Sequence, residues 1–288
     1  MLKGIDVSEH QGVINWDAVK SSGIQFAILR AGYGQNNIDK QFRRNIAECK
    51  RVDMPIGIYW FSYALNESMV RAEAQYAINA VKGYTLSYPI FFDFEYDSVN
   101  YCRRNGVEVS KDFATRLALA FCKEIERQGY YASNYTNMDY ANNMFDMNRL
   151  KDIDIWYAYY NDNCNRKCGL WQYTENGRVP GINGNSVDMN YDFINYPNMI
   201  GNNKEEKKVK NIIIYNGCAD HRSAEVLADY LKCPTISNER PFDYDCVENV
   251  YAVGGKKENY TSYLKTLISG SNRYETMQKV LDFIKKNS

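Results

Sequence analysis

An alternation of strand-like and helix-like segments through residues 1–196 constrains the fold more than any other feature. Apolar and aromatic runs recur, and three of the gaps between them show the three- and four-residue apolar spacing of helices. We expect strands over 3–7, 25–31, 54–62, 89–95, 130–135, 154–160, 169–173 and 187–191, and helices over 39–52, 67–82 and 110–128. Eight strands with intervening helices predict an α/β fold, an irregular TIM-like (β/α) barrel whose last strands are joined by loops rich in Gly and Asn.

The composition changes near residue 197, where Pro, Gly, Asn and a mixed run of charges interrupt the pattern. This predicts a linker over 197–209 between a barrel domain, 1–196, and a second domain, 210–288. Strand and helix patterns then alternate again, which predicts a small α/β/α three-layer domain.

Two carboxylates end one of the apolar runs. Asp93 and Glu95 are two residues apart, so on a strand they project from the same face. Burying ionisable groups there lowers the stability of the fold, so their presence indicates a function. Asp6 lies near the end of the first strand, and Asp188 has a similar setting in the last one. Because active sites of such barrels lie at the carboxyl ends of the strands, we expect the four carboxylates to meet in one site.

Other roles for these carboxylates stay open at this point. The first pair has the alternatives of a structural ion pair, a helix cap or a Mg²⁺ or Mn²⁺ site, and the other two could form hydrogen bonds at strand ends. The chain has only two His, and its eight Cys lack paired metal-ligand spacing. We therefore predict no metal and no cofactor.

Aromatic residues suggest a sugar-binding groove. The chain has 25 Tyr and 4 Trp, side chains that combine an apolar face with a polar tip, although a compositional bias would look the same. The alternative for each aromatic side chain is a place in the barrel core. Candidate groove residues, including one glutamine, are Tyr33, Tyr59, Phe61, Trp156, Tyr160, Trp171 and Gln172.

Charge and hydropathy exclude two classes of partner. With 35 basic and 35 acidic residues, the chain is no polycation, so nucleic-acid binding is not expected. No apolar run approaches membrane-spanning length. The N-terminus enters the first strand without the pattern of a signal peptide, so we expect synthesis in the cytoplasm of the (host) cell.

The first domain resembles the glycoside hydrolase family 25 lysozymes, muramidases common among phage endolysins. The matching motifs are GIDVS at 4–8 with HQG at 10–12, FAILRAGY at 26–33, IGIYWF at 56–61, FDFE at 92–95, WQYT at 171–174 and VD at 187–188. The resemblance implies that Glu95, Asp93, Asp6 and Asp188 are the catalytic set. Trp60 departs from the family, in which many members have His after the preceding Tyr.

The second domain resembles a single copy of the type 2 clostridial cell-wall-binding repeat. The residues concerned are VYAVGG at 250–255 and GSNRYET at 270–276. This implies wall binding by Arg273 and Tyr274, although Arg273 could instead pair with a carboxylate at a helix start. Such repeats usually occur in threes, so a lone copy predicts a homodimer through this domain.

These resemblances imply a peptidoglycan hydrolase that cleaves the β-1,4 bond between N-acetylmuramic acid and N-acetylglucosamine. Glu95 would donate the proton and Asp93 would orient the acetamido group of the substrate, with direct attack by a water or by an aspartate as the alternatives. The expected partners are peptidoglycan and a secondary cell-wall polymer, reached after release from the cell through a holin. The alternatives are a non-catalytic wall-binding lectin and a hydrolase of another amino-sugar polymer.

Overall fold

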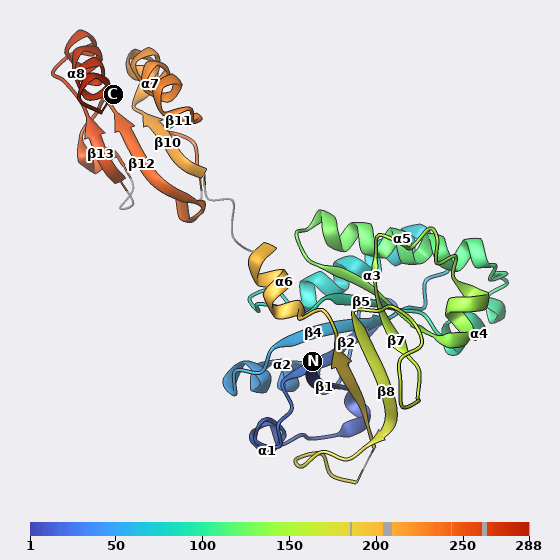
Figure 1. Ribbon diagram of the computed structural model, residues 1–288. Coiled ribbons are helices and arrows are strands. Elements are labelled where there is room, and N and C mark those ends of the chain that lie inside the picture. Colours follow the sequence, from blue (N-terminus) through green and yellow to red (C-terminus); the bar gives the residue numbers. More distant parts are fainter. Residues whose placement is uncertain (185, 204–208, 243, 261–263, 288) are drawn as a thin grey trace. The chain divides into compact units, whose positions relative to one another are not determined.

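The computed structural model describes residues 1–288 except 185, 204–208, 243, 261–263 and 288. The chain divides into two compact units, Met1–Asn202 and Asn203–Ser288, and each is described by itself (Figure 1). Among the residues that the structure describes, no helix is both long enough and apolar enough to cross a membrane.

The first unit contains a closed barrel, as the sequence predicts. Its strands follow the order β1-β9-β8-β7-β6-β5-β4-β2, and pairing of β1 with β2 closes the ring. The barrel strands are β1 Leu2–Val7, β2 Phe26–Tyr33, β4 Ile56–Phe61, β5 Ile90–Asp93, β6 Ala132–Asn137, β7 Asp154–Ala158, β8 Leu170–Gly177 and β9 Val187–Asp192. A short strand, β3 Asn37–Ile38, pairs with the end of β2.

One barrel strand runs against the others. β9 pairs antiparallel with both β1 and β8, whereas the remaining pairs around the ring are parallel. The start of β9 therefore lies at the mouth where the other strands end.

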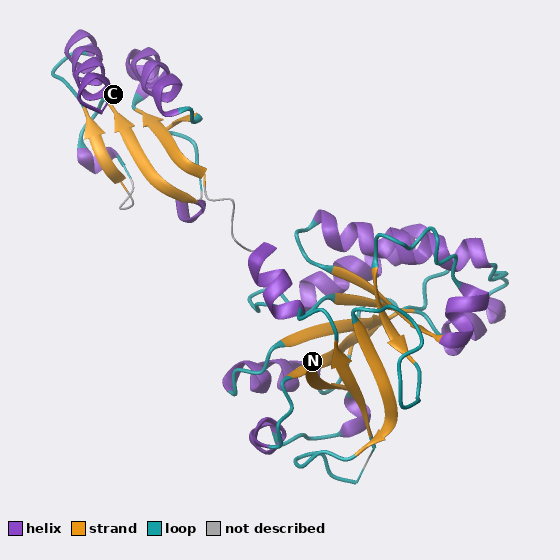
Figure 2. Cartoon of the chain, viewed as in Figure 1, coloured by secondary structure: helices purple, strands orange, loops and turns teal. Residues whose placement is uncertain are grey.

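Helices accompany the early strands, and loops join the late ones (Figure 2). The helices are α1 Trp16–Ser21, α2 Phe42–Arg51, α3 Glu67–Ala80, α4 Tyr96–Arg104, α5 Lys111–Arg127 and α6 Tyr196–Asn203, with a 3-10 turn at Glu9–Gln11 and a π-helical turn at Tyr140–Met144. The predicted helices at 39–52, 67–82 and 110–128 correspond to α2, α3 and α5. From β7 to β9 the described residues contain no helix, and the antiparallel pair β8–β9 needs none because a short connection can join such strands.

The barrel has an apolar interior beneath its mouth. Phe26, Phe91 and Leu170 are fully buried there, and each contributes about 1.5–3 kcal/mol by its burial. Gly4 leaves room for the interior ring of Phe26, because a Cβ on Gly4 would lie 2.4 Å from that ring. A larger apolar layer fills the space between the strands and the helices.

The prediction of a linker over 197–209 is wrong for residues 197–203. Residues 197–203 belong to α6, because Tyr196 and Ile200 lie one helical turn apart and both are buried against the barrel interior. Residues 204–208 of the predicted linker lie outside the described residues, and the next strand begins at Val209.

The second unit is a parallel sheet with helices on one face. The sheet order is β11-β10-β12-β13. Its elements are β10 Val209–Tyr215, α7 Gly217–Leu231, β11 Thr235–Ser237, β12 Val247–Val253, β13 Leu264–Ile268 and α8 Arg273–Asn287. Both helices pack on the same apolar face. The three-layer prediction is wrong in the described part of this unit, because residues of short 3-10 segments, such as Tyr244 and Cys246, cover the second face.

Candidate active site

Three strands bring the four predicted carboxylates to the barrel mouth. Asp6 is the penultimate residue of β1, Asp93 is the last residue of β5, and Glu95 follows two residues later at the N-cap of α4. Asp188 lies at the start of β9, directly opposite Asp6 in the ladder. The expected convergence therefore occurs, but Asp188 reaches the mouth because β9 is antiparallel, and not because it ends a strand.

Two amide side chains fix Asp6. Gln172 Nε2 and Asn190 Nδ2 donate to Asp6 Oδ2 over 2.9 and 2.7 Å. Asn190 Oδ1 in turn accepts from Trp156 Nε1 over 2.8 Å. Gln172 is a predicted site residue, whereas the sequence prediction misses Asn190. Strand alternation is the signal that finds it, because Asn190 lies two residues after Asp188 and so shares its face.

Two tyrosines orient Gln172. The hydroxyl groups of Tyr135 and Tyr160 donate to Gln172 Oε1 over 3.1 and 3.0 Å. Tyr160, a predicted groove residue, is 49% exposed and lies at the rim, whereas Tyr135 is buried and was not predicted. The amide group of Gln172 is therefore held with its nitrogen toward Asp6.

The four carboxyl groups influence one another in two pairs, Asp6 with Asp188 and Asp93 with Glu95. Ionising one carboxyl group of a close pair disfavours ionising the other, so the titration belongs to the pair.

Burial raises the pKa of both members of the first pair. The pKa of Asp6 rises to about 6, because desolvation outweighs the hydrogen bonds from Asn190 and Gln172. Desolvation, followed by the charge of Asp6, raises the pKa of Asp188 to about 8. The pair as a whole therefore holds a proton more readily than exposed carboxyl groups do.

Burial acts in the same direction on the second pair. It raises the pKa of Glu95 to about 7, and the charge of Asp188 adds to the shift. The pKa of Asp93 is raised by burial and then by the charges of Glu95 and Asp6, while Arg30 lowers it. Desolvation is thus the larger cause of both shifts, and the crowding of carboxylates is the smaller one.

Arg30 supplies positive charge beside this acidic set. It lies on β2, where Nε donates to Asp39 Oδ2 over 2.8 Å and Nη2 donates to Glu9 Oε1 over 3.0 Å. Its guanidinium lies 5.7 Å from the centre of the Tyr33 ring. Two carboxylates therefore hold Arg30 in place.

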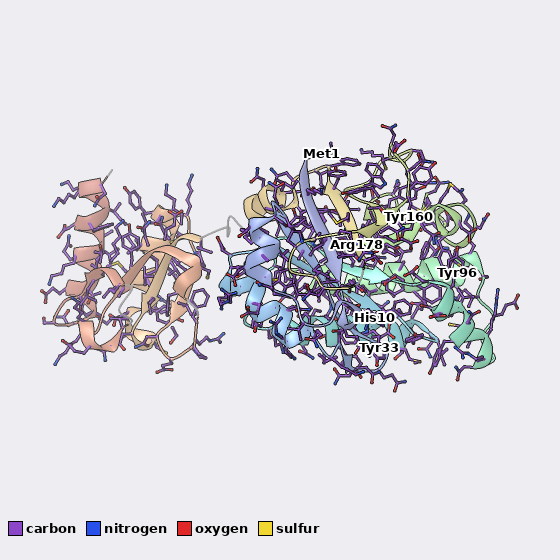
Figure 3. All side chains as sticks on the ribbon, turned by 90° about the horizontal axis from the view of Figure 1, so that it is seen from below. Met1, His10, Tyr33, Tyr96, Tyr160 and Arg178 are labelled. Atoms are coloured by element: carbon purple, nitrogen blue, oxygen red, sulfur yellow. The ribbon has the colours of Figure 1, made fainter. Side chains whose placement is uncertain are left out.

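A cavity of about 410 Å³ opens at the ends of β2 and β4. Its lining residues are Glu9, His10, Arg30, Tyr33, Phe61, Tyr63 and Asp97. Figure 3 shows two of them, His10 and Tyr33, close together. Tyr33 and Phe61 are predicted groove residues, and Tyr63 was not predicted. Its position just past the end of β4 is the signal that could have found it.

Tyr59 faces the carboxylates from the barrel wall. Burial raises the pKa of its hydroxyl, and the charges of Asp6, Asp93 and Asp188 act in the same direction against Arg30. The predicted position of Tyr59 near the site therefore agrees with the structure.

Both tryptophans predicted to line the groove lie elsewhere. Trp156 is 2% exposed and packs inside the barrel, 4.9 Å from the Phe91 ring and 4.7 Å from the Tyr135 ring. Trp171 is 6% exposed and contacts the outer side chains of β8 and β9. Adjacent residues of a strand point to opposite faces of the sheet. Because Gln172 faces the barrel interior, Trp171 faces the outside of the barrel.

The two predicted wall-binding residues border a cavity in the second unit. Arg273 and Tyr274 begin α8, and with Arg222 of α7 they line a cavity of about 510 Å³. Its other lining residues are Cys218, Ala219, Ser223 and Met277, so none of the lining residues is acidic. Tyr274 is 77% exposed, with the Arg273 guanidinium 5.3 Å from the centre of its ring.

Known proteins match the barrel and, in one case, the whole chain. The family model for glycosyl hydrolases family 25 matches residues 5–182. The autolytic lysozyme of Clostridium acetobutylicum is 26% identical over 191 residues, which cover 64% of this chain and 54% of that protein. The chain thus spans about half the length of this curated relative.

Two solved structures resemble the chain. The CTP1L endolysin is 33% identical, with 99% of this chain and 100% of that chain covered and a TM-score of 0.59. The autolysin LytC of Streptococcus pneumoniae, solved with a synthetic peptidoglycan ligand, is 28% identical over 66% of this chain and 46% of that chain, with a TM-score of 0.58. The family match includes Asp6, Asp93 and Glu95. The chain belongs to glycosyl hydrolases family 25.

Proposed function

We propose that the chain is an endolysin-type peptidoglycan hydrolase that cleaves the β-1,4 bond between N-acetylmuramic acid and N-acetylglucosamine. The observation that carries this proposal is the Asp93–Glu95 pair at the barrel mouth, where burial raises the pKa of Glu95 to about 7. Glycoside cleavage needs a carboxyl group that is still protonated near neutral pH, because the leaving oxygen is a poor leaving group without a proton. The lysozyme and LytC relatives support peptidoglycan as the substrate.

In this mechanism Glu95 protonates the glycosidic oxygen, and Asp93 acts on the substrate's acetamido group. Asp93 Oδ1 is buried and has no hydrogen-bond partner within the described residues. An unpartnered buried acceptor of this kind fits an acetamido N–H group. Accepting that bond would turn the acetamido oxygen toward the anomeric carbon as the sugar ring becomes positively charged.

Asp6 and Asp188 stabilise this charge and position the reacting sugar. Gln172 and Asn190 hold Asp6 in place, so its carboxylate needs little rearrangement during the reaction. Tyr33, Tyr59 and Phe61 would form part of the sugar-binding wall.

A hydrolase of another amino-sugar polymer is the second candidate, and a wall-binding lectin is the third. The raised pKa of Glu95 favours catalysis over simple binding, because sugar binding alone does not require a protonated acid. Mass analysis of fragments from purified cell walls and from chitin separates the three. New reducing N-acetylmuramic acid ends support the proposal. Reducing N-acetylglucosamine ends from either polymer, or no fragments, would contradict it.

We infer that the second unit is a single cell-wall-binding domain of the type 2 clostridial kind. Arg222 and Arg273 face one cavity without an acidic lining residue, which suits an anionic secondary wall polymer, and exposed Tyr274 offers a face for a sugar. The helix α6 belongs with the catalytic unit, so the domain boundary is expected between residues 203 and 209. Limited proteolysis with a first stable cut outside this interval would contradict the boundary.

We also propose a homodimer through the second unit. Leu281 marks an apolar face of α8 away from the wall-binding cavity, and its side chain is 46% exposed. A second copy would cover this face and raise the affinity for a repetitive polymer. Light scattering of the full chain should give a dimer, and Leu281→Glu should give a monomer. A monomeric wild-type chain would exclude the dimer.

A separate C-terminal fragment is a further part of the proposal. The CTP1L endolysin is described as regulated by a secondary translation product. In this chain, Met199 is a candidate internal start, although it lies in α6 and not in a linker. N-terminal sequencing of material purified through a C-terminal tag would show a fragment that begins at Met199 or exclude it.

We place the action of the protein at the bacterial cell wall after release from the cytoplasm that makes it, with a holin as the release route. Its likeness to an endolysin supports this order of events. Expression with and without a holin should give lysis only with the holin. Equal lysis in both cases would contradict this route.

A further inference from the structure

One buried carboxyl group of the barrel takes no part in the proposed proton transfer. Glu73 lies on α3 and is 1% exposed. Burial raises its pKa to about 7, and in the described part of the chain no basic side chain contributes to the shift. A buried carboxyl group without a counterion is costly, and such groups cluster at functional sites.

Glu73 holds the turn that follows β4. Ser62 Oγ donates to Glu73 Oε2 over 2.6 Å, and the backbone nitrogen of Tyr63 donates to Oε1 over 3.0 Å. The hydroxyl of Ser62 also accepts from the backbone nitrogen of Ala64 over 3.2 Å. Both oxygens of one carboxyl group therefore fix the backbone at residues 62–64.

The same turn is tied to the catalytic strand. The backbone nitrogen of Ser62 donates to the carbonyl oxygen of Asp93 over 2.7 Å. The turn is thus fixed on one side by α3 and on the other by the strand that carries the Asp93–Glu95 pair. Tyr63 follows directly, so its position relative to this pair depends on Glu73.

The ring of Tyr63 forms part of the cavity at the ends of β2 and β4. It contacts Phe61 at 5.2 Å, Tyr101 at 5.1 Å and Tyr33 at 6.3 Å between ring centres. Asp97 lines the same cavity, and its charge adds to the raised pKa of Glu95, which links the cavity to the proton donor. A half-buried aromatic ring here offers an apolar face with a polar tip, which suits a sugar ring.

We propose that Tyr63 contacts a sugar ring of the substrate next to the cleaved bond, and that Glu73 is the positioning residue that holds Tyr63 there. This inference rests on the proposed hydrolysis of a glycan. The opposing explanation gives Glu73 a role in stability alone, with no effect on substrate binding.

Steady-state kinetics on a soluble chain of alternating N-acetylmuramic acid and N-acetylglucosamine separate these explanations. Tyr63→Ala should raise KM about tenfold and leave kcat within about twofold, because it removes binding without changing the proton donor. Glu73→Leu removes both acceptor oxygens and should raise KM by a similar factor. Glu73→Gln keeps one acceptor and should show a smaller rise.

Glu124 provides the matched control. It lies on α5, is 8% exposed, accepts hydrogen bonds from Gln75 and Arg127, and does not line the cavity. Glu124→Leu should lower Tm with KM unchanged. An equal rise of KM in the Glu124 and Glu73 variants would overturn the positioning role.

An unchanged KM in Tyr63→Ala would overturn the sugar contact. If Glu73→Leu does not fold, Tyr63→Ala and Glu73→Gln decide the question, and an unchanged KM in Glu73→Gln with a raised KM in Tyr63→Ala would remove Glu73 from the proposal. A wild-type chain that releases no reducing ends would overturn the hydrolase function itself. Wild-type activity with an unaffected Tyr63 variant overturns only this inference.

Discussion

The barrel and the second unit use charge in opposite ways. Glu95 is half-buried at the barrel mouth, and burial raises its pKa to about 7. Arg222 and Arg273 lie exposed on the helices of the second unit. Burial makes a carboxyl group hold a proton near neutral pH at the expense of stability, whereas exposed guanidinium groups remain available to a polymer at little structural cost.

The difference predicts different sensitivities in the two units. A reaction that depends on one proton should fail when a single buried carboxyl becomes an amide of the same shape. A binding surface made of exposed charges should weaken gradually, and salt should weaken it too.

The largest effect is expected at the proton donor. Glu95→Gln should lower the rate of release of reducing ends by about 10² to 10⁴, because the amide has the same shape but cannot protonate the leaving oxygen. Circular dichroism and thermal unfolding should show a folded variant. Retention of more than about a tenth of the wild-type rate would exclude Glu95 as the general acid.

The second largest effect is expected at Asp93. Asp93→Asn should lower kcat about a hundredfold, because the amide nitrogen that replaces one carboxyl oxygen cannot accept the hydrogen bond of the acetamido group. Asp17→Asn changes an exposed carboxylate paired with Arg51 and should leave kcat unchanged. Equal rates for wild type and Asp93→Asn would require a mechanism without an acetamido-orienting carboxylate.

Stability should respond to pH differently in the two units. The pKa of Glu73 is raised to about 7, so the folded chain holds this proton longer than the unfolded chain does. The stability that Glu73 contributes is present below its ordinary pKa and is lost as pH rises through 7. Between pH 5 and 8 this loss is about 2–3 kcal/mol, and Glu73→Gln should abolish it.

Glu275 of the second unit is the contrasting case. Hydrogen bonds from Ser271, followed by the one from Lys279, lower its pKa to about 2, so its contribution is lost only as pH falls below about 4.5. Urea unfolding of Glu275→Gln should therefore show the wild-type dependence between pH 5 and 8. A Glu73→Gln chain that keeps the full wild-type slope would contradict the shift.

The smallest effects are expected on the binding of the protein to cell walls. Arg222→Gln and Arg273→Gln should each weaken sedimentation with purified cell walls about tenfold, and added salt should reduce the difference. Cleavage of the soluble glycan should not change. Lys285→Gln, on the last turn of α8, is the control. If the control weakens wall binding as much as the arginine variants, the cavity is not the binding site.

The sequence predicts the barrel well because side-chain periodicity reports strands and helices directly. Each of the eight expected strands has a counterpart, from β1 at Leu2–Val7 to β9 at Val187–Asp192. Periodicity carries no information on strand direction, so the antiparallel course of β9 could not be read from it. The sequence pattern predicts Asp188 at the carboxyl end of its strand, whereas it lies at the start of β9 and meets Asp6 only because β9 is antiparallel.

The tryptophans and the linker show where local patterns fail. Strand alternation predicts that Trp171 and Gln172 face opposite sides of the sheet, but it does not predict which side is the barrel interior. Gln172 faces the interior because it donates a hydrogen bond to Asp6, a contact that exists only in the folded chain. Trp156 is on the inner face but below the mouth, a depth that strand phase does not reveal. The polar run after Asn195 hides a helix because two positions, Tyr196 and Ile200, are enough to anchor it.

The protonation state of Glu95 is the centre of this account, and carbon NMR of a chain labelled at the Glu side-chain carboxyl carbons measures it directly. Spectra recorded from pH 4 to 9 should contain two carboxyl resonances that titrate near 7, those of Glu95 and Glu73. The Glu95→Gln and Glu73→Gln variants should each remove one of them. Titration of the Glu95 resonance at its ordinary pKa, near 4.5, would contradict the account, because the buried mouth would then hold no proton for the leaving oxygen.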